Sequence, residues 1–194
     1  DGTIWVTGPV AGNAQTNGLT TELPISPTTF TRVVLPPGAQ VTSIDGQDVP
    51  CAIFAMRADG TALSWGDTNR SCDGQGAGGI RVGAAVTPGV LPIPGHVFDV
   101  SGGGYSSLAI VAREGADVWS WGQSYGAGRA GDLSRPAPIP GLTNVVEVQT
   151  WFRHGYALRA DGSVYGWGLN DSAAGGFPAT SGPVRGIGGI GDLA

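Results

Sequence analysis

The sequence predicts an all-β fold built from repeated β-hairpins. The clearest repeat runs from Arg153 to Gly168 and consists of an apolar strand, an Ala-Asp-Gly turn and a return strand that closes on Trp-Gly. Related segments close at Gly66 and Gly122, and the chain opens inside another that closes at Gly8. A turn glycine takes a positive φ at little steric cost, so each copy indicates a hairpin. The closing glycines follow one another at roughly 50 residues, a period typical of solenoids and propeller blades.

A Pro followed by a short apolar strand precedes the hairpins. The matching apolar positions of this strand are held by Val97, Val145 and Ile190, and again by Val100, Val148 and Leu193. A degenerate copy begins at Pro37. Matching apolar positions predict a further strand in each repeat that keeps one face apolar.

The composition supports an ordered β fold and excludes some functions. With 35 Gly and 14 Pro in 194 residues, long helices are not expected, whereas 41% hydrophobic residues and regular strand signals predict a turn-dense core. The net charge of −5 and the absence of a basic run predict that the protein has no positively charged surface for binding nucleic acid. No apolar stretch is long enough to span a bilayer, and Asp1 opens within a repeat instead of a signal peptide.

Two cysteines flank one of the hairpins. Cys51 precedes its first strand and Cys72 follows its second strand by one loop, so a disulfide between them is compatible with the hairpin geometry. The alternative is two unrelated, small buried thiols. The lack of Lys and the abundance of Thr, Gly and Pro favour an extracellular or cell-surface location.

The repeat resembles that of the regulator of chromosome condensation family, in the style of its bacterial surface or secreted members. The residues that match the family pattern in order are His154, Ala157, Leu158, Asp161, Gly162, Trp167 and Gly168. The other copies depart from it, with Ala52 and Ser107 in place of the His, Glu114 in place of the turn Asp, and Thr7 in place of the first Trp.

The resemblance implies a β-propeller of four-stranded blades, of which this chain would hold about half a ring, three to four blades. Residues 1–194 then form a single partial propeller domain. Its expected parts are the end of one blade at 1–8, successive repeats at about 32–80, 90–131 and 138–176, and the opening strand of a further blade at 183–194. Half a ring leaves open strand edges, so we expect a longer polypeptide, further copies or another chain to cover them.

Two loop motifs have a chemical and a structural interpretation. Residues 126–131 fit G-x-G-x-x-G, but Pro136 and Pro138 stand where a dinucleotide fold needs a helix, so the Gly-rich loop of the repeat is the favoured interpretation. Oxygen ligands alternate as in a calcium loop at Asp67, Asn69, Ser71 and Asp73. The positions that require Gly and a bidentate acid hold Cys72 and Gly78, which favours an ordinary polar loop.

The sequence offers no catalytic constellation, and we expect neither an enzyme nor a metal or cofactor. The only histidines are His96 and His154, and no H-E-x-x-H motif is present. Carboxylates that could converge in space are Asp45, Asp48, Asp99 and Glu147, although nothing singles them out.

Four of the six tryptophans have a position that suggests a role. Trp65, Trp121 and Trp167 hold repeat positions and are expected to pack between blades. Trp151, Phe152 and Arg153 form a different group, placed where a propeller faces one end of its ring. Because aromatic residues and Arg are common interface anchors, this segment is a candidate binding site, with simple packing as the alternative.

Together these observations predict a non-catalytic protein-binding propeller module, extracellular or surface-displayed. The alternative is a structural assembly unit that completes a propeller ring or fibre with other copies or chains. In either case the expected partner is a protein or further copies of the chain, and no membrane-spanning segment or nucleic acid is expected.

Overall fold

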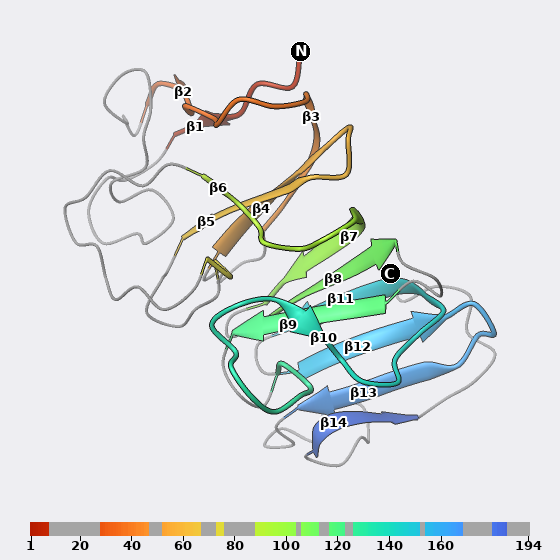
Figure 1. Cartoon of the computed structure of the whole chain (residues 1–194). Coiled ribbons are helices and arrows are strands. Elements are labelled where there is room, and N and C mark those ends of the chain that lie inside the picture. The colour runs from red at the N-terminus through yellow and green to blue at the C-terminus, as the bar shows by residue number, and fades with distance from the viewer. Residues whose placement is uncertain are drawn as a thin grey trace.

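The computed structural model describes residues 1–7, 28–46, 52–66, 73–75, 88–103, 106–112, 117–122, 126–151, 154–168 and 180–185. These residues form strands β1 to β14 and no helix (Figure 1). The predicted all-β fold class is therefore confirmed. None of the described segments is a helix that could cross a membrane.

The strands form one two-stranded sheet and three four-stranded sheets, each antiparallel. The first sheet pairs β1 (Trp5–Val6) with β2 (Thr31–Arg32). The second sheet contains β3 (Val41–Asp45), β4 (Ala52–Arg57), β5 (Ala62–Gly66) and β6 (Gly89–Val90). The third contains β7 (His96–Gly102), β8 (Ser106–Ala112), β9 (Asp117–Gly122) and β10 (Ala137–Pro138). The fourth contains β11 (Val145–Trp151), β12 (His154–Arg159), β13 (Val164–Gly168) and β14 (Thr180–Arg185).

The Asp-Gly turns form as their residue types require. Gly60 has a φ of 79° and Gly162 a φ of 75°, values that side-chain-bearing residues adopt at a cost. The Asp59 carboxylate accepts a hydrogen bond from the Thr61 amide at 2.9 Å, and Asp161 does the same for the amide of Ser163 at 2.9 Å. The turn therefore depends on a Gly with a positive φ and on an Asp whose carboxylate accepts a hydrogen bond from the backbone amide two residues later.

A β-bulge in the first strand of a sheet turns apolar residues that lie three positions apart to the same face. Residues three apart, such as Val97 and Val100, point to opposite faces of a regular strand. The register of β7 with β8 shifts between Val97 and Asp99, and β11 shifts in the same way between Val145 and Glu147. The extra residue returns both valines to one buried face. The predicted apolar face is confirmed, although strict alternation does not produce it.

The sheets stack face to face in chain order, and the cores lie between them (Figure 1). β7 packs against β4 and β3 of the sheet before it, and β11 packs against β8 and β7. One core contains Ala52, Phe54, Ala62, Leu91, Val97, Val100, Ala109 and Trp121. The next contains Leu108, Ile110, Val118, Ile139, Leu142, Val145, Val148, Ala157 and Trp167. Consecutive antiparallel sheets packed in this way fit a partial β-propeller.

The repeat tryptophans lie in these cores, as predicted. Trp121 meets the ring of Phe54 from the preceding sheet edge to face, with 5.7 Å between the ring centroids. Trp167 donates its indole N–H to the carbonyl of Gly126 in the preceding sheet's loop at 2.9 Å. Trp65 is buried beside Ile4 and Val33 of the first sheet region.

Two of these indoles, those of Trp121 and Trp167, also require a glycine in the loop that they contact. A Cβ on Gly74 would lie 2.9 Å from the indole nitrogen of Trp121, and one on Gly128 would lie 2.6 Å from that of Trp167. Both glycines have a positive φ, 67° and 66°. The backbone of each glycine can therefore contact the indole ring directly, and this contact joins the Gly-rich loop to the next sheet.

We expect Trp167→Ala to lower the free energy of unfolding by about 3–5 kcal/mol, because it empties a fully buried site between two sheets. Trp5→Ala, at a tryptophan that is 55% exposed, is the matched control and is expected to change it by less than about 1 kcal/mol. Urea denaturation of both variants measures the difference. Equal losses would contradict the packing role of Trp167.

Candidate protein-binding face

Trp151 is an exposed aromatic residue at the end of β11. Its side chain is 64% exposed, whereas Trp121 and Trp167 are at most 1% exposed. Along this strand, Val148 and Thr150 are buried against the preceding sheet, so the alternating Trp151 points the other way. The Trp151 side chain therefore lies on the face of β11 that is turned away from the preceding sheet, and it is exposed to solvent.

His154 forms a platform for the Trp151 ring. The two residues are directly paired across β11 and β12, and their rings stack with 6.4 Å between centroids and a 16° angle between planes. His154 is 5% exposed and also pairs with Gly168, which closes the repeat on β13. The repeat-position histidine thus supports an exposed tryptophan from below.

The backbone beneath Trp151 is fixed by hydrogen bonds to the preceding sheet. The Thr150 amide donates to the Ser101 hydroxyl at 3.0 Å, and the two hydroxyl oxygens lie 3.1 Å apart. Both side chains are buried. An aromatic side chain on an anchored strand loses little further entropy on binding, which is the property of an interface hot spot.

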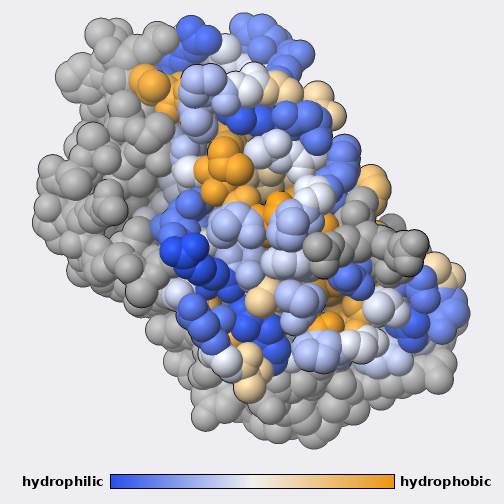
Figure 2. All heavy atoms as spheres, in the orientation of Figure 1, coloured by the Kyte–Doolittle hydropathy of each residue, from blue (hydrophilic) through white to orange (hydrophobic). Residues whose placement is uncertain are grey.

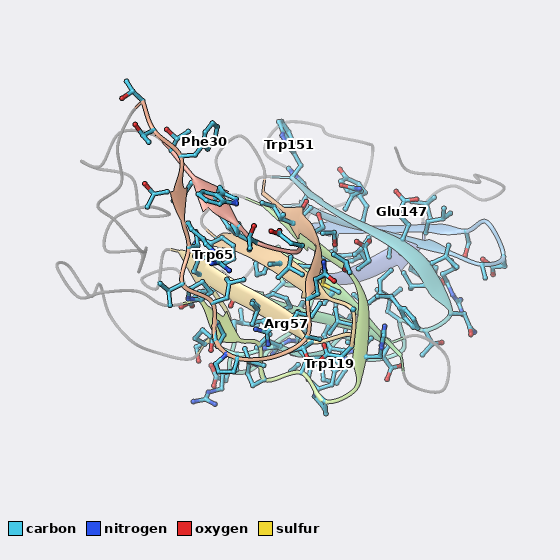
Figure 3. All side chains as sticks on the ribbon, turned by 90° about the horizontal axis from the view of Figure 1, so that it is seen from above. Phe30, Arg57, Trp65, Trp119, Glu147 and Trp151 are labelled. Atoms are coloured by element: carbon cyan, nitrogen blue, oxygen red, sulfur yellow. The ribbon has the colours of Figure 1, made fainter. Side chains whose placement is uncertain are left out.

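A second exposed aromatic residue lies at the same end of the sheets. Phe30, directly before β2, is 67% exposed. Figure 3 shows Phe30 and Trp151 on one side of the molecule, with Arg57 and Trp119 on the other. Sequence reasoning missed Phe30, because residues 30–34 do not alternate between apolar and polar types and so give a weak strand signal.

Elsewhere the exposed apolar residues are dispersed. Figure 2 shows small apolar groups separated by hydrophilic residues on the face turned to the viewer. Phe98 and Val146, the extra residues of two bulges, are exposed on strands of different sheets. We define the aromatic face as Trp151 with its His154 platform, together with Phe30 at the same end.

Several predicted residues lie outside the described part of the chain. These are Phe152 and Arg153 of the candidate binding segment, Cys51 and Cys72 of the candidate disulfide, and Asp48 of the carboxylate group. Of the candidate calcium ligands only Asp73 is described, and it is buried, with its carbonyl accepting a hydrogen bond from the Ser64 hydroxyl. Within the described segments, no three His, Cys, Asp or Glu residues are grouped to hold a metal ion.

Two of the candidate carboxylates do approach each other. Burial raises the pKa of Asp45, and the charge of Asp99 raises it further, while the Gly102 amide, which donates to the Asp45 carboxylate at 3.0 Å, opposes the shift. Burial also raises the pKa of Asp99, against hydrogen bonds from the amides of Val100 and Val148. Both carboxylates thus accept hydrogen bonds from backbone amides of the following sheet. These bonds help to join neighbouring sheets.

The residues of the G-x-G-x-x-G segment bond to other parts of the fold. The Gly126 carbonyl accepts the Trp167 N–H. The Arg129 guanidinium donates to the carbonyls of Ser120, Ala130, Asp132 and Arg135, so it closes the loop on itself. No helix follows among the described residues 132–140, and the loop therefore serves packing between sheets.

Parts of several curated proteins are similar in sequence to this chain. The chain is 34% identical over 96 residues to a bifunctional serine/threonine-protein kinase/NEDD4-like E3 ubiquitin-protein ligase of Dictyostelium discoideum, a match that covers 43% of this chain and 5% of that protein. It is 32% identical over 124 residues to human E3 ubiquitin-protein ligase HERC2, a match that covers 61% of this chain and 2% of that protein. It is 31% identical over 142 residues to Protein pim1 of Schizosaccharomyces pombe, covering 59% and 25%.

Solved structures share the fold. Human WBSCR16 aligns with a TM-score of 0.71 at 18% identity over 95% of this chain and 48% of that chain. Yeast RCC1 (Prp20) bound to Kap60 aligns with a TM-score of 0.66 at 20% identity, over 99% of this chain and 45% of that chain. No protein-family model matches the chain. The chain thus spans at most a quarter of these curated relatives and less than half of these solved propellers.

These comparisons confirm the predicted resemblance to proteins built from regulator of chromosome condensation repeats. Its fold is a partial β-propeller of that type. A bacterial style is not part of what the comparisons establish.

The raised pKa of Asp45 predicts a pH dependence of stability. A carboxyl whose pKa is higher in the folded state favours folding when protonated, so its contribution falls as the pH rises from about 4 through the folded pKa. Asp59 and Asp132, whose pKa values are lowered by bonds from nearby residues, act in the opposite direction. The difference between the wild type and Asp45→Asn therefore isolates this residue.

We expect Asp45→Asn to be less affected than the wild type by raising the pH from 4 to 7, because its amide oxygen still accepts from Gly102 but carries no charge. Urea midpoints at several pH values measure this difference. Parallel pH profiles for the two proteins would show that Asp45 titrates normally.

Proposed function

We propose that this protein is a non-catalytic binding module that engages a protein partner through the aromatic face. The single observation that carries this proposal is Trp151, a large aromatic residue that is 64% exposed on an anchored strand and stacked on a buried histidine. A monomeric fold gains nothing from holding an indole rigidly in water, whereas an interface does.

The relatives supply examples of the same use of the fold. A solved yeast Prp20p structure, which aligns over 79% of this chain with a TM-score of 0.63, is described with its binding to Gsp1p and histones. Another is bound to Kap60. By analogy the partner of this chain is a folded protein or a protein segment, and the propeller acts as its scaffold.

The carboxylate chemistry also favours binding over catalysis. Asp45 and Asp99 hold backbone amides of the next sheet, so neither is presented to a substrate. An extracellular or cell-surface location remains part of the proposal, on the composition of the chain. Mass spectrometry of the protein from its source, which identifies a Cys51–Cys72 disulfide or two free thiols, tests that location.

We expect Trp151→Ala to lower affinity for the partner by about 10-fold or more, the effect of losing an aromatic hot spot. The partner is first identified by placing a photo-crosslinking amino acid at Gln149, which is exposed two residues before Trp151 on the same strand, in the source cells. Titration of the purified pair then measures the affinity.

Phe98→Ala is the matched control, because Phe98 is 63% exposed but lies near the start of β7, away from the Trp151 end of the sheets. Its affinity should equal that of the wild type. A loss on Phe98→Ala with none on Trp151→Ala would place the interface elsewhere and contradict the proposal.

A second candidate function is assembly into a larger ring, favoured by the first sheet. Among the described residues β1 and β2 form a two-stranded sheet, whereas the other three sheets have four strands. Light scattering tests this function: masses at multiples of 19.5 kDa, or aggregation through open sheet faces, support it. A stable, soluble species of 19.5 kDa contradicts it.

A further inference from the structure

Trp151 leaves one face of its indole ring open to solvent. His154 covers the other face, because the two rings stack with 6.4 Å between their centroids and a 16° angle between their planes. The Trp151 side chain is still 64% exposed. The face of an indole attracts a positive charge more strongly than the face of any other aromatic side chain. The charges near Trp151 therefore indicate which kind of partner it can bind.

The first strand of each four-stranded sheet carries negative charge. These strands are β3, β7 and β11, and they contain Asp45, Asp99 and Glu147 respectively. None of the three strands contains Lys or Arg, and their one titratable base, His96, begins β7. A positively charged group near these strands is therefore attracted by carboxylates and meets no fixed positive charge on them.

Asp45 lies at the same end of these strands as Trp151. It ends β3, and its carboxylate accepts the amide of Gly102, the last residue of β7, at 3.0 Å. In the next pair of sheets, the hydroxyl oxygens of Ser101 and Thr150 lie 3.1 Å apart, and Thr150 directly precedes Trp151. The Asp45 carboxylate is held by the backbone, but a half-buried charge acts on a partner over several ångströms without touching it.

Glu147 lies on the same face of β11 as Trp151. Residues 147, 149 and 151 alternate along the strand with Val148 and Thr150, which are buried against the preceding sheet. The side chains of Glu147 and Trp151 are both labelled in Figure 3. An acid and an open indole on one face of one strand fit a partner segment that is basic and not one that is acidic.

Trp5 shows that exposure alone does not create this setting. Its side chain is 55% exposed, yet Arg32 is its direct partner across β1 and β2. The Trp5 indole N–H also donates to the Thr3 hydroxyl at 2.9 Å. Trp151 is instead paired with His154, and its strand contains no Lys or Arg. The two tryptophans therefore allow an internal comparison of an exposed indole with and without a fixed cation beside it.

We propose that Trp151 binds an Arg side chain in a basic segment of the partner protein, with the guanidinium on the open face of the indole. The inference rests on the proposed function and names the chemistry of the partner at the same site. Its argument is charge complementarity, because the first strands of the sheets carry carboxylates and no Lys or Arg. Arg fits better than Lys, since its planar guanidinium stacks on an aromatic ring and is more weakly hydrated.

A short peptide tests this chemistry on the intact chain. The probe is acetyl-Arg-Gly-Ser-Gly-Arg-amide, and the control peptide carries neutral citrulline at both Arg positions. Replacing all tryptophans by fluorotryptophan lets fluorine NMR follow each indole, and Trp151→Phe identifies the signal of residue 151. We expect the Arg peptide to shift this signal, with an affinity about 3- to 10-fold higher than that of the citrulline peptide. The signals of Trp5, Trp121 and Trp167 should not move.

Variants that change one charge then test the electrostatic part. Glu147→Gln should weaken binding of the Arg peptide about 3-fold and leave that of the citrulline peptide unchanged, since it removes a charge from the face of Trp151. Asp117→Asn is the matched control and should change neither affinity. Asp117 pairs with Val111, and Val111 pairs with Val97, so this acid lies beside the start of β7, away from the Trp151 end. Added salt should weaken binding of the Arg peptide alone.

The proposal is overturned if the Arg peptide leaves the Trp151 signal in place, if both peptides bind equally, or if the Trp5 signal responds as that of Trp151 does. It can also fail while the proposed function holds. A partner captured at Gln149 that no longer binds after Trp151→Ala, but that contacts the chain through a segment without Arg or Lys, would have this meaning. A captured partner whose basic segment loses affinity when its Arg is replaced by Gln supports both.

Discussion

The packing of each repeat tryptophan against the preceding sheet is the interaction on which the rest of the structure depends. No single sheet can bury its own apolar face, so each one folds only against a neighbour. Trp167 shows how the contact is made, since its ring presses on Gly128 and its N–H bonds to Gly126. Trp121 repeats the ring contact at Gly74. The Gly-rich loops are therefore part of the core, despite a composition typical of flexible linkers.

This stacking also creates the aromatic face. Because the preceding sheet holds β11 through buried valines and the Ser101–Thr150 contact, the end of that strand has a fixed position. Trp151 is carried there with His154 beneath it. A rigid scaffold that presents an exposed aromatic side chain is what a protein-binding module requires.

Much of the fold could be predicted because its signals are local. An Asp-Gly turn, a closing Trp-Gly and strands of apolar residues each act within about 15 residues, so Gly60 and Gly162 take their predicted conformations and Trp121 its predicted burial. Of the candidate site, Trp151 could be selected as exposed because it stands outside the repeat pattern. Phe30 was missed, since its short strand has a single partner and a weak sequence signal.

The sequence by itself determined the hairpins, their turns, the number of sheets to within one, and the tryptophans that join them. Only the tertiary structure decided which residues meet across the sheets: the bulge that turns Val97 and Val100 to one face, and the approach of Asp45 to Asp99. The physical reason is the range of the interactions. Turn and strand preferences depend on neighbours in the chain, whereas burial and pKa depend on residues some 50 positions away, which no local pattern specifies.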